Sequence, residues 1–134
     1  FTNRLGASGN TITLLPLRTK FVATDGTNWF ELKTGSADYI EKTSAYTAFA
    51  GDNIFVDTSG GAVTITLPSS PSQGDTVSFI DSEGTFDTAN LTVEPGSEKI
   101  MAQTAGDEMV VDTNNAAFAL VYQDSTYGWR LRSH

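Results

Sequence analysis

Hydrophobic and polar residues alternate along most of this chain, in short stretches separated by Gly, Asp, Asn, Ser and Pro. The clearest stretch is Ala62–Leu67, where every second residue from Val63 onward is aliphatic and the residues between are threonines. A period of two is typical of a strand with one buried face. Pro68 then ends the pairing, because proline has no N–H to donate. The stretch therefore predicts a half-buried strand.

Nine further stretches share this character: Thr11–Leu15, Lys20–Thr24, Trp29–Leu32, Asn53–Asp57, Thr76–Asp81, Leu91–Val93, Glu108–Asp112, Phe118–Gln123 and Trp129–Arg132. Turn residues recur about every 8–12 positions, and helical patterns of about 10–15 residues are missing between the strands. This spacing favours a sandwich or barrel over βαβ units. We therefore expect an all-β fold, a β-sandwich or barrel-like module of short antiparallel strands.

Two stretches depart from the alternation. Residues 35–50 place Ser36 where a helix N-cap would stand, so we expect either a short helix or a linker there. Ala116–Tyr122 has no polar face, which predicts a strand covered on both sides. Its second cover is either another part of the domain, as for a central strand, or another copy of the chain.

Two segments of the chain repeat each other. Phe21–Leu32 aligns without gaps on Leu120–Leu131, with identical valine, aspartate, threonine and leucine positions. Each segment predicts a β-hairpin whose turn is led by an aspartate that accepts N–H groups two residues further on. We accordingly expect a short β-hairpin module at 1–34 and a main β-sandwich domain at 51–134. The first is too small to bury a core alone, so we expect other chains to supply burial.

Composition narrows the classes of function. The 134 residues include nineteen Thr and twelve Ser, no Cys, and a formal net charge of -8. This acidity argues against nucleic acid as a partner, since such binders need clustered cations. The chain also has no run of about 18 apolar residues, so we expect no membrane insertion. Without cysteine, neither a disulfide nor a thiolate metal site can form.

At this point a family resemblance appears in the segments GDNIFVDTSGGAVTITLPSSPSQGDTVSFIDSEGTFDTANLTVEP, SEKIM and DTNNAAFALVYQDSTYGWRL. Together, from about Gly51 to Leu131, they resemble the carboxy-terminal module of bacteriophage tail-fibre and related virion fibre proteins. TDGTNWFEL, nearer the amino end, looks like the closing hairpin of such modules. On this resemblance, residues 1–34 would be the end of a preceding fibre module.

The resemblance implies a homotrimeric knob exposed on a virion, where it contacts other virion proteins and binds a host cell-surface glycan or protein. One alternative is a capsid decoration or adaptor protein with a purely structural role. A second alternative, a spike enzyme that cleaves glycans, would need two carboxylates in different environments. Nearly all aspartates fall in turns, which explains them without catalysis. We therefore expect no enzymatic activity and no cofactor.

Candidate chemistry is sparse. The single histidine is His134, the last residue given, so we expect no His-based triad, which needs a histidine held in orientation by a third group. The loop Asp81–Asp87 offers oxygen atoms at alternate positions but lacks the distal Glu of an EF-hand, so we expect an acidic hairpin loop and no metal.

Three residues are the candidates for receptor binding: Tyr127, Asp124 and Trp129. Tyr127 lies between a Ser-Thr turn and Gly128, so we expect it at an exposed loop tip, where binding residues concentrate. An aromatic face can stack on a sugar ring. For Trp129, as for Trp29, packing over its own sheet is the competing interpretation.

Overall fold

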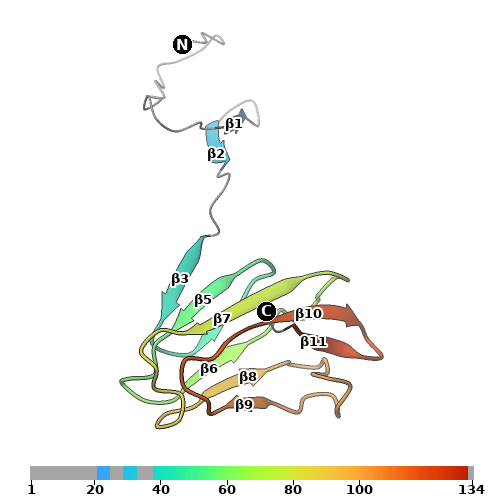
Figure 1. Cartoon of the computed structure of the whole chain (residues 1–134). Coiled ribbons are helices and arrows are strands. Elements are labelled where there is room, and N and C mark those ends of the chain that lie inside the picture. Colours follow the sequence, from blue (N-terminus) through green and yellow to red (C-terminus); the bar gives the residue numbers. More distant parts are fainter. Residues whose placement is uncertain (1–20, 25–28, 33–37, 133–134) are drawn as a thin grey trace. The chain divides into compact units, whose positions relative to one another are not determined.

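The computed structural model describes residues 21–24, 29–32 and 38–132 (Figure 1). The chain divides into two units, Phe1–Ala37 and Asp38–His134. In the first unit, β1 (Phe21–Thr24) pairs antiparallel with β2 (Trp29–Leu32). The expected strand Thr11–Leu15 lies outside the described residues. Within the described ranges, no helix is long and apolar enough to cross a membrane.

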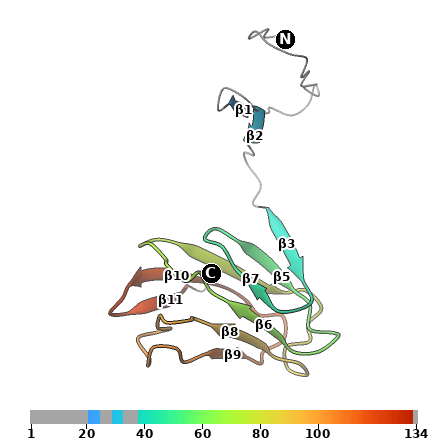
Figure 2. The ribbon, with the colours of Figure 1, turned by 180° about the vertical axis from the view of Figure 1, so that it is seen from behind.

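The second unit, here called the main domain, consists of two stacked sheets (Figures 1 and 2). The five-stranded sheet has the order β11 (Gly128–Arg132), β10 (Ala117–Asp124), β7 (Thr76–Asp81), β5 (Asn53–Val56) and β3 (Tyr39–Lys42). The four-stranded sheet has the order β4 (Tyr46–Thr47), β6 (Val63–Thr66), β8 (Leu91–Glu94) and β9 (Met109–Val111). The expected all-β, sandwich-like fold is confirmed at this level.

Strand direction differs from the expectation. Strands β3, β5 and β7 are parallel to one another, and so are β4, β6 and β8. The prediction of antiparallel strands was therefore wrong for these pairs, although β10 and β11 in one sheet and β9 in the other do pair antiparallel. Parallel neighbours need a long crossover. Here each crossover contains a strand of the opposite sheet, as in a parallel β-helix.

The segment 35–50 also differs. From Asp38 onward it contains β3 and β4, each an edge strand of one of the two sheets, rather than a helix or linker. β3 pairs with β5 from Tyr39↔Asn53 onward. The N-cap pattern at Ser36 was outweighed because Ile40 and Tyr46 pack against the core. Tertiary burial thus decided a segment whose local preference was weak.

The core lies between the sheets and is formed by alternate strand residues. On β5, β6 and β7 every second residue is buried. Trp129, Phe79 and Phe86 are the largest side chains that are fully buried. β10 lies between β7 and β11, so it is interior to its sheet. Its inward Leu120 is buried, but Ala117 on its outer face is exposed, so the domain alone does not provide the expected cover on both faces of this strand.

Aspartates hold the turns, as the sequence predicted. Asp57, Asp75 and Asp124 each accept a hydrogen bond from a nearby backbone N–H. Asp81, which is buried, accepts more: Oδ1 from the N–H groups of Gly84 (2.9 Å) and Thr85 (3.2 Å), and Oδ2 from those of Phe86 (3.4 Å) and Asn115 (2.9 Å). This carboxylate therefore joins the loop after β7 to the loop before β10.

Replacing Asp81 tests this role. We expect Asp81→Ala to lower the free energy of unfolding by about 3 kcal/mol, because it leaves partly buried N–H groups without their charged acceptor. Asp57→Ala, which removes an exposed acceptor of one N–H, should cost clearly less. Urea denaturation followed by circular dichroism measures both. Equal midpoints for the two variants would contradict the assignment.

Candidate functional site

The hairpin of β10 and β11 presents the expected loop tip. Tyr122 pairs with Trp129 and Asp124 with Gly128, with a register shift between the two pairs. In the tip, Oδ1 of Asp124 accepts the N–H groups of Thr126 at 2.8 Å and Tyr127 at 2.9 Å. The prediction of an Asp-led turn in this segment is confirmed. Asp124 thus fixes the backbone that carries Tyr127.

Gly128 is the residue that lets a second segment approach the hairpin. Its φ is 70°, and a Cβ atom there would lie 2.0 Å from the carbonyl oxygen of Lys99. That carbonyl accepts the N–H of Trp129 at 2.7 Å. Only glycine combines this positive φ with so close a backbone contact.

Residues 98–102 run beside the hairpin and are bonded to it repeatedly. Met101 donates its N–H to the carbonyl of Trp129 at 2.8 Å, and Ala102 donates to that of Tyr127 at 3.0 Å. Nζ of Lys99 donates to the carbonyl of Thr126 at 3.3 Å. We call residues 98–102 and 124–129 the tip site. Its backbone is fixed by hydrogen bonds within the hairpin turn and between the two segments.

The tip site contains strained backbone. Met101 and Ala102 are adjacent and have φ values of 53° and 63°. Left-handed geometry costs a non-glycine residue of order 1–2 kcal/mol. Such strain persists where surrounding bonds over-determine it, and it concentrates at functional sites. Met101 is 43% exposed and Tyr127 is 47% exposed. Two large side chains therefore reach solvent from a backbone that is fixed by hydrogen bonds.

Trp129 does not share that exposure. Its side chain is fully buried and meets the ring of Tyr122 edge-on, with centroids 5.4 Å apart. Its Nε1–H has no acceptor among the described residues, a cost of about 1–3 kcal/mol that burial of a large ring outweighs. The prediction that Trp129 contacts a receptor directly is therefore wrong, because its side chain packs in the core beneath the tip. Of the three candidate residues, only Tyr127 is an exposed aromatic.

The side chain of Tyr122, on β10, links the hairpin to residues 98–102. Its hydroxyl donates to Oε2 of Glu98 at 2.8 Å. Burial raises the pKa of Tyr122 above its ordinary value, and the hydrogen bond to Glu98 and the charges of Glu98 and Asp124 raise it further. The folded state therefore favours the neutral phenol and keeps this hydrogen bond at neutral pH.

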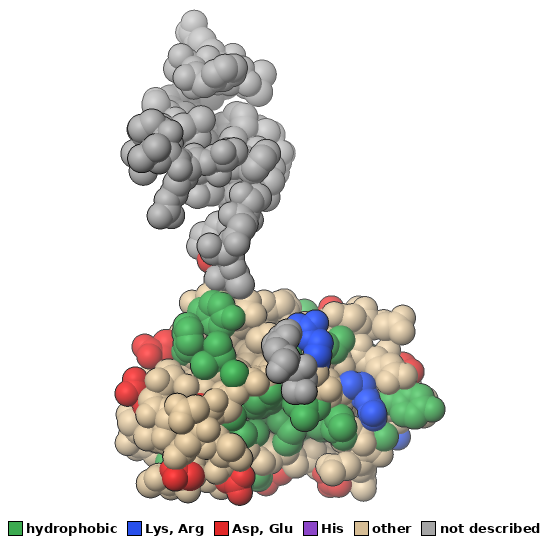
Figure 3. All heavy atoms as spheres, in the orientation of Figure 1, with side chains coloured by type: hydrophobic (Ala, Val, Ile, Leu, Met, Phe, Trp, Pro, Cys, Tyr) green, Lys and Arg blue, Asp and Glu red, His purple; other side chains and the backbone are tan. Residues whose placement is uncertain are grey.

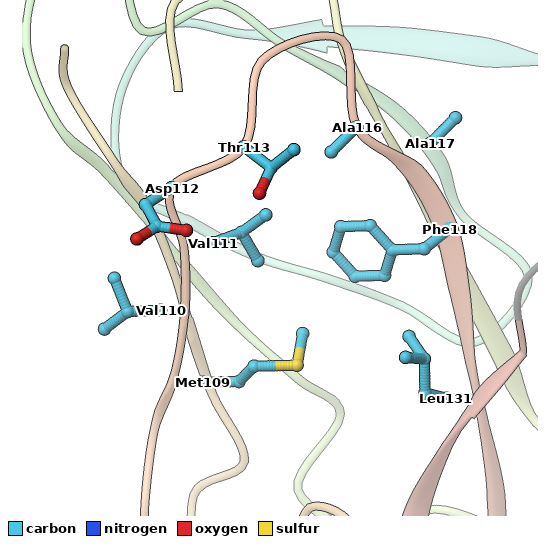
Figure 4. Close-up of a pocket in the computed structure, with 9 residues that line it drawn as sticks. All are labelled: Met109, Val110, Val111, Asp112, Thr113, Ala116, Ala117, Phe118 and Leu131. Carbon is cyan, nitrogen blue, oxygen red and sulfur yellow. The ribbon is translucent and has the colours of Figure 1, made fainter. Parts of the chain in front are cut away.

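A second candidate feature is an apolar groove between β9 and the β10–β11 hairpin. Hydrophobic side chains gather there on the face drawn in Figure 3. The groove has a volume of about 310 Å³. Met109 and Val111 point across it toward Phe118 and Leu131, whereas Asp112 points away (Figure 4). Its lining offers apolar contact and no pairing of nucleophile with base.

The loop Asp81–Asp87 shows what its acidic residues do. Both oxygens of Asp81 accept backbone N–H groups, and Oδ1 of Asp87 accepts the hydroxyl of Thr88 at 2.9 Å. The hydrogen bond from Thr88, together with the side chain of Asn114, holds the pKa of Asp87 below its usual value. In the part of the chain that the structure describes, no three His, Cys, Asp or Glu residues are placed to hold a metal ion. His134 lies outside the described residues.

Comparison with protein-family models and with curated proteins finds no match to this chain. The chemical groups of the tip site are therefore the basis for inferring its function. The site presents the exposed ring of Tyr127, the partly exposed side chain of Met101, whose Sδ accepts the N–H of Leu131 at 3.2 Å, and the ammonium group of Lys99. Sequence reasoning located Tyr127 and Asp124 but missed Met101 and Lys99, because the approach of residues 98–102 depends on pairing across 24 or more positions.

The close contact at Gly128 makes a sharp test. We expect Gly128→Ala to lower the free energy of unfolding by about 3 kcal/mol, because Cβ would overlap the backbone of Lys99. Gly74→Ala is the matched control: its φ is also positive, at 91°, but nothing lies within 4 Å of the added atom. That variant should lose about 1 kcal/mol. Chemical denaturation measures both, and similar losses would refute the close approach.

The Tyr122–Glu98 pair predicts a titration. Because the folded pKa of Tyr122 is raised, its contribution to stability is present below the ordinary tyrosine pKa of 10.0 and is lost as pH rises through the folded pKa. Glu98→Gln should lower the pKa of Tyr122 toward 10.0. Ultraviolet titration of tyrosinate, with Tyr122→Phe as reference, measures this. An unchanged pKa in Glu98→Gln would rule out the coupling.

Proposed function

We propose that this chain is a bacteriophage virion fibre module that attaches to the host surface through the tip site of a homotrimer. Tyr127 is the observation that carries the proposal: an aromatic side chain 47% exposed at the end of a hairpin whose backbone is fixed by Asp124 and by residues 98–102. The sequence resemblance to tail-fibre modules supplies the setting, in which the chain belongs to an exposed virion appendage and contacts other virion proteins.

The chemistry of the tip site suits a host glycan or a protein surface. The phenol ring of Tyr127 can stack on the C–H face of a sugar while its hydroxyl forms hydrogen bonds. Met101, whose Sδ accepts the N–H of Leu131, adds a polarizable apolar side chain that is 43% exposed in the same site. Because the backbone is already ordered, binding loses little conformational entropy. The groups match recognition, and none of them forms a pair suited to acid–base catalysis.

Affinity in this proposal comes from several weak contacts. One exposed tyrosine and one methionine form a small contact area, so a single tip should bind weakly. Three identical tips per fibre raise the effective concentration of the second and third contacts and can strengthen attachment by about 10²–10⁴-fold. A capsid decoration role, the structural alternative, would use the same fold but would not depend on the side chain of Tyr127.

Removal of the Tyr127 ring tests the proposal. Beads coated with the full chain should be retained by some strains in a panel of bacteria with different envelope glycans, and Tyr127→Ala should reduce retention about tenfold or more. Phe49→Ala is the matched control, because Phe49 is 70% exposed but lies outside the tip site. Flow cytometry of bead-bound cells gives the measurement.

Two results would count against attachment through the tip. One is that no strain retains the wild-type beads with or without divalent cations, which favours the decoration role. The other is that Tyr127→Ala and Phe49→Ala bind equally well to a strain that retains the wild type. Circular dichroism of each variant ensures that both are folded.

A further inference from the structure

We infer that the outer face of the five-stranded sheet is the surface through which copies of this chain associate. The outer face comprises the strand residues that point away from the core, and its apolar members are Tyr39, Phe55, Ile80, Ala117, Ala119 and Val121. It is a different surface from the tip site. The inference rests on the proposed function only in that it names the face that would hold the homotrimer together.

The strand pairing places these residues in adjoining rows. Ile80 lies between Ala117 on one neighbouring strand and Phe55 on the other. Phe55 in turn contacts Tyr39, with ring centroids 4.8 Å apart. Val121 continues the apolar surface along β10, beyond the small and already buried Ala119. The surface therefore crosses the sheet from β10 to β3 instead of being a set of scattered side chains.

The other sheet provides the contrast. The outward residues on its paired strands are mainly threonines, including Thr64, Thr66 and Thr92, followed by Glu94. Such a face is typical of a sheet that is solvated on one side. Both sheets cover the same core, so burial inside the domain does not require the apolar residues outside the five-stranded sheet. A covering surface outside the domain accounts for them.

The charge distribution supports another copy as the covering surface. Residues 38–134 contain fourteen acidic and four basic residues, which leaves a net charge of -10, so two copies repel one another through most faces. At the paired outward positions of β5, β7 and β10, from Ala117 to Val121, there is no charged side chain. This face is therefore the one on which two copies can approach with least repulsion.

The edges of the face are complementary. Arg130 and Arg132 stand on β11, opposite Val121 and Ala119, at one edge of the sheet. Glu41 stands on β3 at the other edge, opposite Phe55. A rotation axis parallel to the strands places the β11 edge of one copy beside the β3 edge of the next. The arginines then meet Glu41 around a closed ring while the apolar residues face the axis.

Sedimentation velocity of the full chain tests this. The wild type should sediment as an oligomer of its 14.3 kDa chain at micromolar concentrations. Ile80→Glu should weaken association about tenfold or more, because it buries a charge at the centre of the contact. Thr92→Glu, the same change of charge on the outer face of the four-stranded sheet, should leave association unchanged.

Charge reversal provides a second test that does not alter apolar positions. Glu41→Arg should weaken association about tenfold, and so should Arg130→Glu combined with Arg132→Glu. All three changes together should restore it, because the complementary edges are exchanged. A wild type that is monomeric, including one whose residues 1–37 cover the face, would overturn the inference. So would equal effects of Ile80→Glu and Thr92→Glu, or a triple variant that stays dissociated.

These outcomes separate the two proposals. If association fails these tests while Tyr127→Ala still loses cell binding, the face is refuted and the tip site stands. If association behaves as described while Tyr127→Ala binds normally, the tip site is refuted and the face stands.

Discussion

The two sheets of the main domain share one core, so their strands bury the alternate side chains that face the opposite sheet. From β3 to β8 the chain passes to the other sheet after every strand. Burial of one Val, Leu, Ile or Phe side chain contributes about 1.5–3 kcal/mol, while ordering one residue of backbone costs about 1–2 kcal/mol. The inward residues must therefore offset the ordering of the outward ones as well as their own. This constraint leaves the outward positions free to differ, and they do: one outer face is rich in threonine and the other is apolar.

The loops at the ends of the strands are stabilised by a different interaction, the acceptance of backbone N–H groups by aspartate. Asp81 joins two loops in this way, and Asp124 fixes the turn that carries Tyr127. Five of the fourteen acidic residues of the domain accept backbone N–H groups in this way: Asp52, Asp57, Asp75, Asp81 and Asp124. The domain therefore carries a high negative charge, while the paired outward positions of β5, β7 and β10 carry none, and the exposed tip is held by hydrogen bonds in a chain without cysteine.

The sequence alone predicts the class of fold and most strand positions, because a strand with one buried face shows alternating apolar and polar residues. Trp29–Leu32 and Thr76–Asp81 coincide with β2 and β7. Strand direction could not be obtained this way, since the same alternation serves parallel and antiparallel neighbours. β3 was missed because Ser36 gave a competing helix signal. In the tip site, Asp124 and Tyr127 carried a local turn signal, whereas Met101 and Lys99 are brought there by long-range pairing, and the burial of Trp129 depends on its contact with Tyr122.

Under the proposed function, attachment depends on several tips held in one assembly. The most direct test of this dependence compares the retention on bacteria of soluble wild-type chain and of a dissociated Ile80→Glu chain, at equal concentrations of tips and with Tyr127 intact in both. We expect the wild type to survive washing and the dissociated chain to be released, with apparent affinities that differ by about 10²–10⁴-fold. Equal retention of the two would contradict it, because a single tip would then be sufficient for attachment.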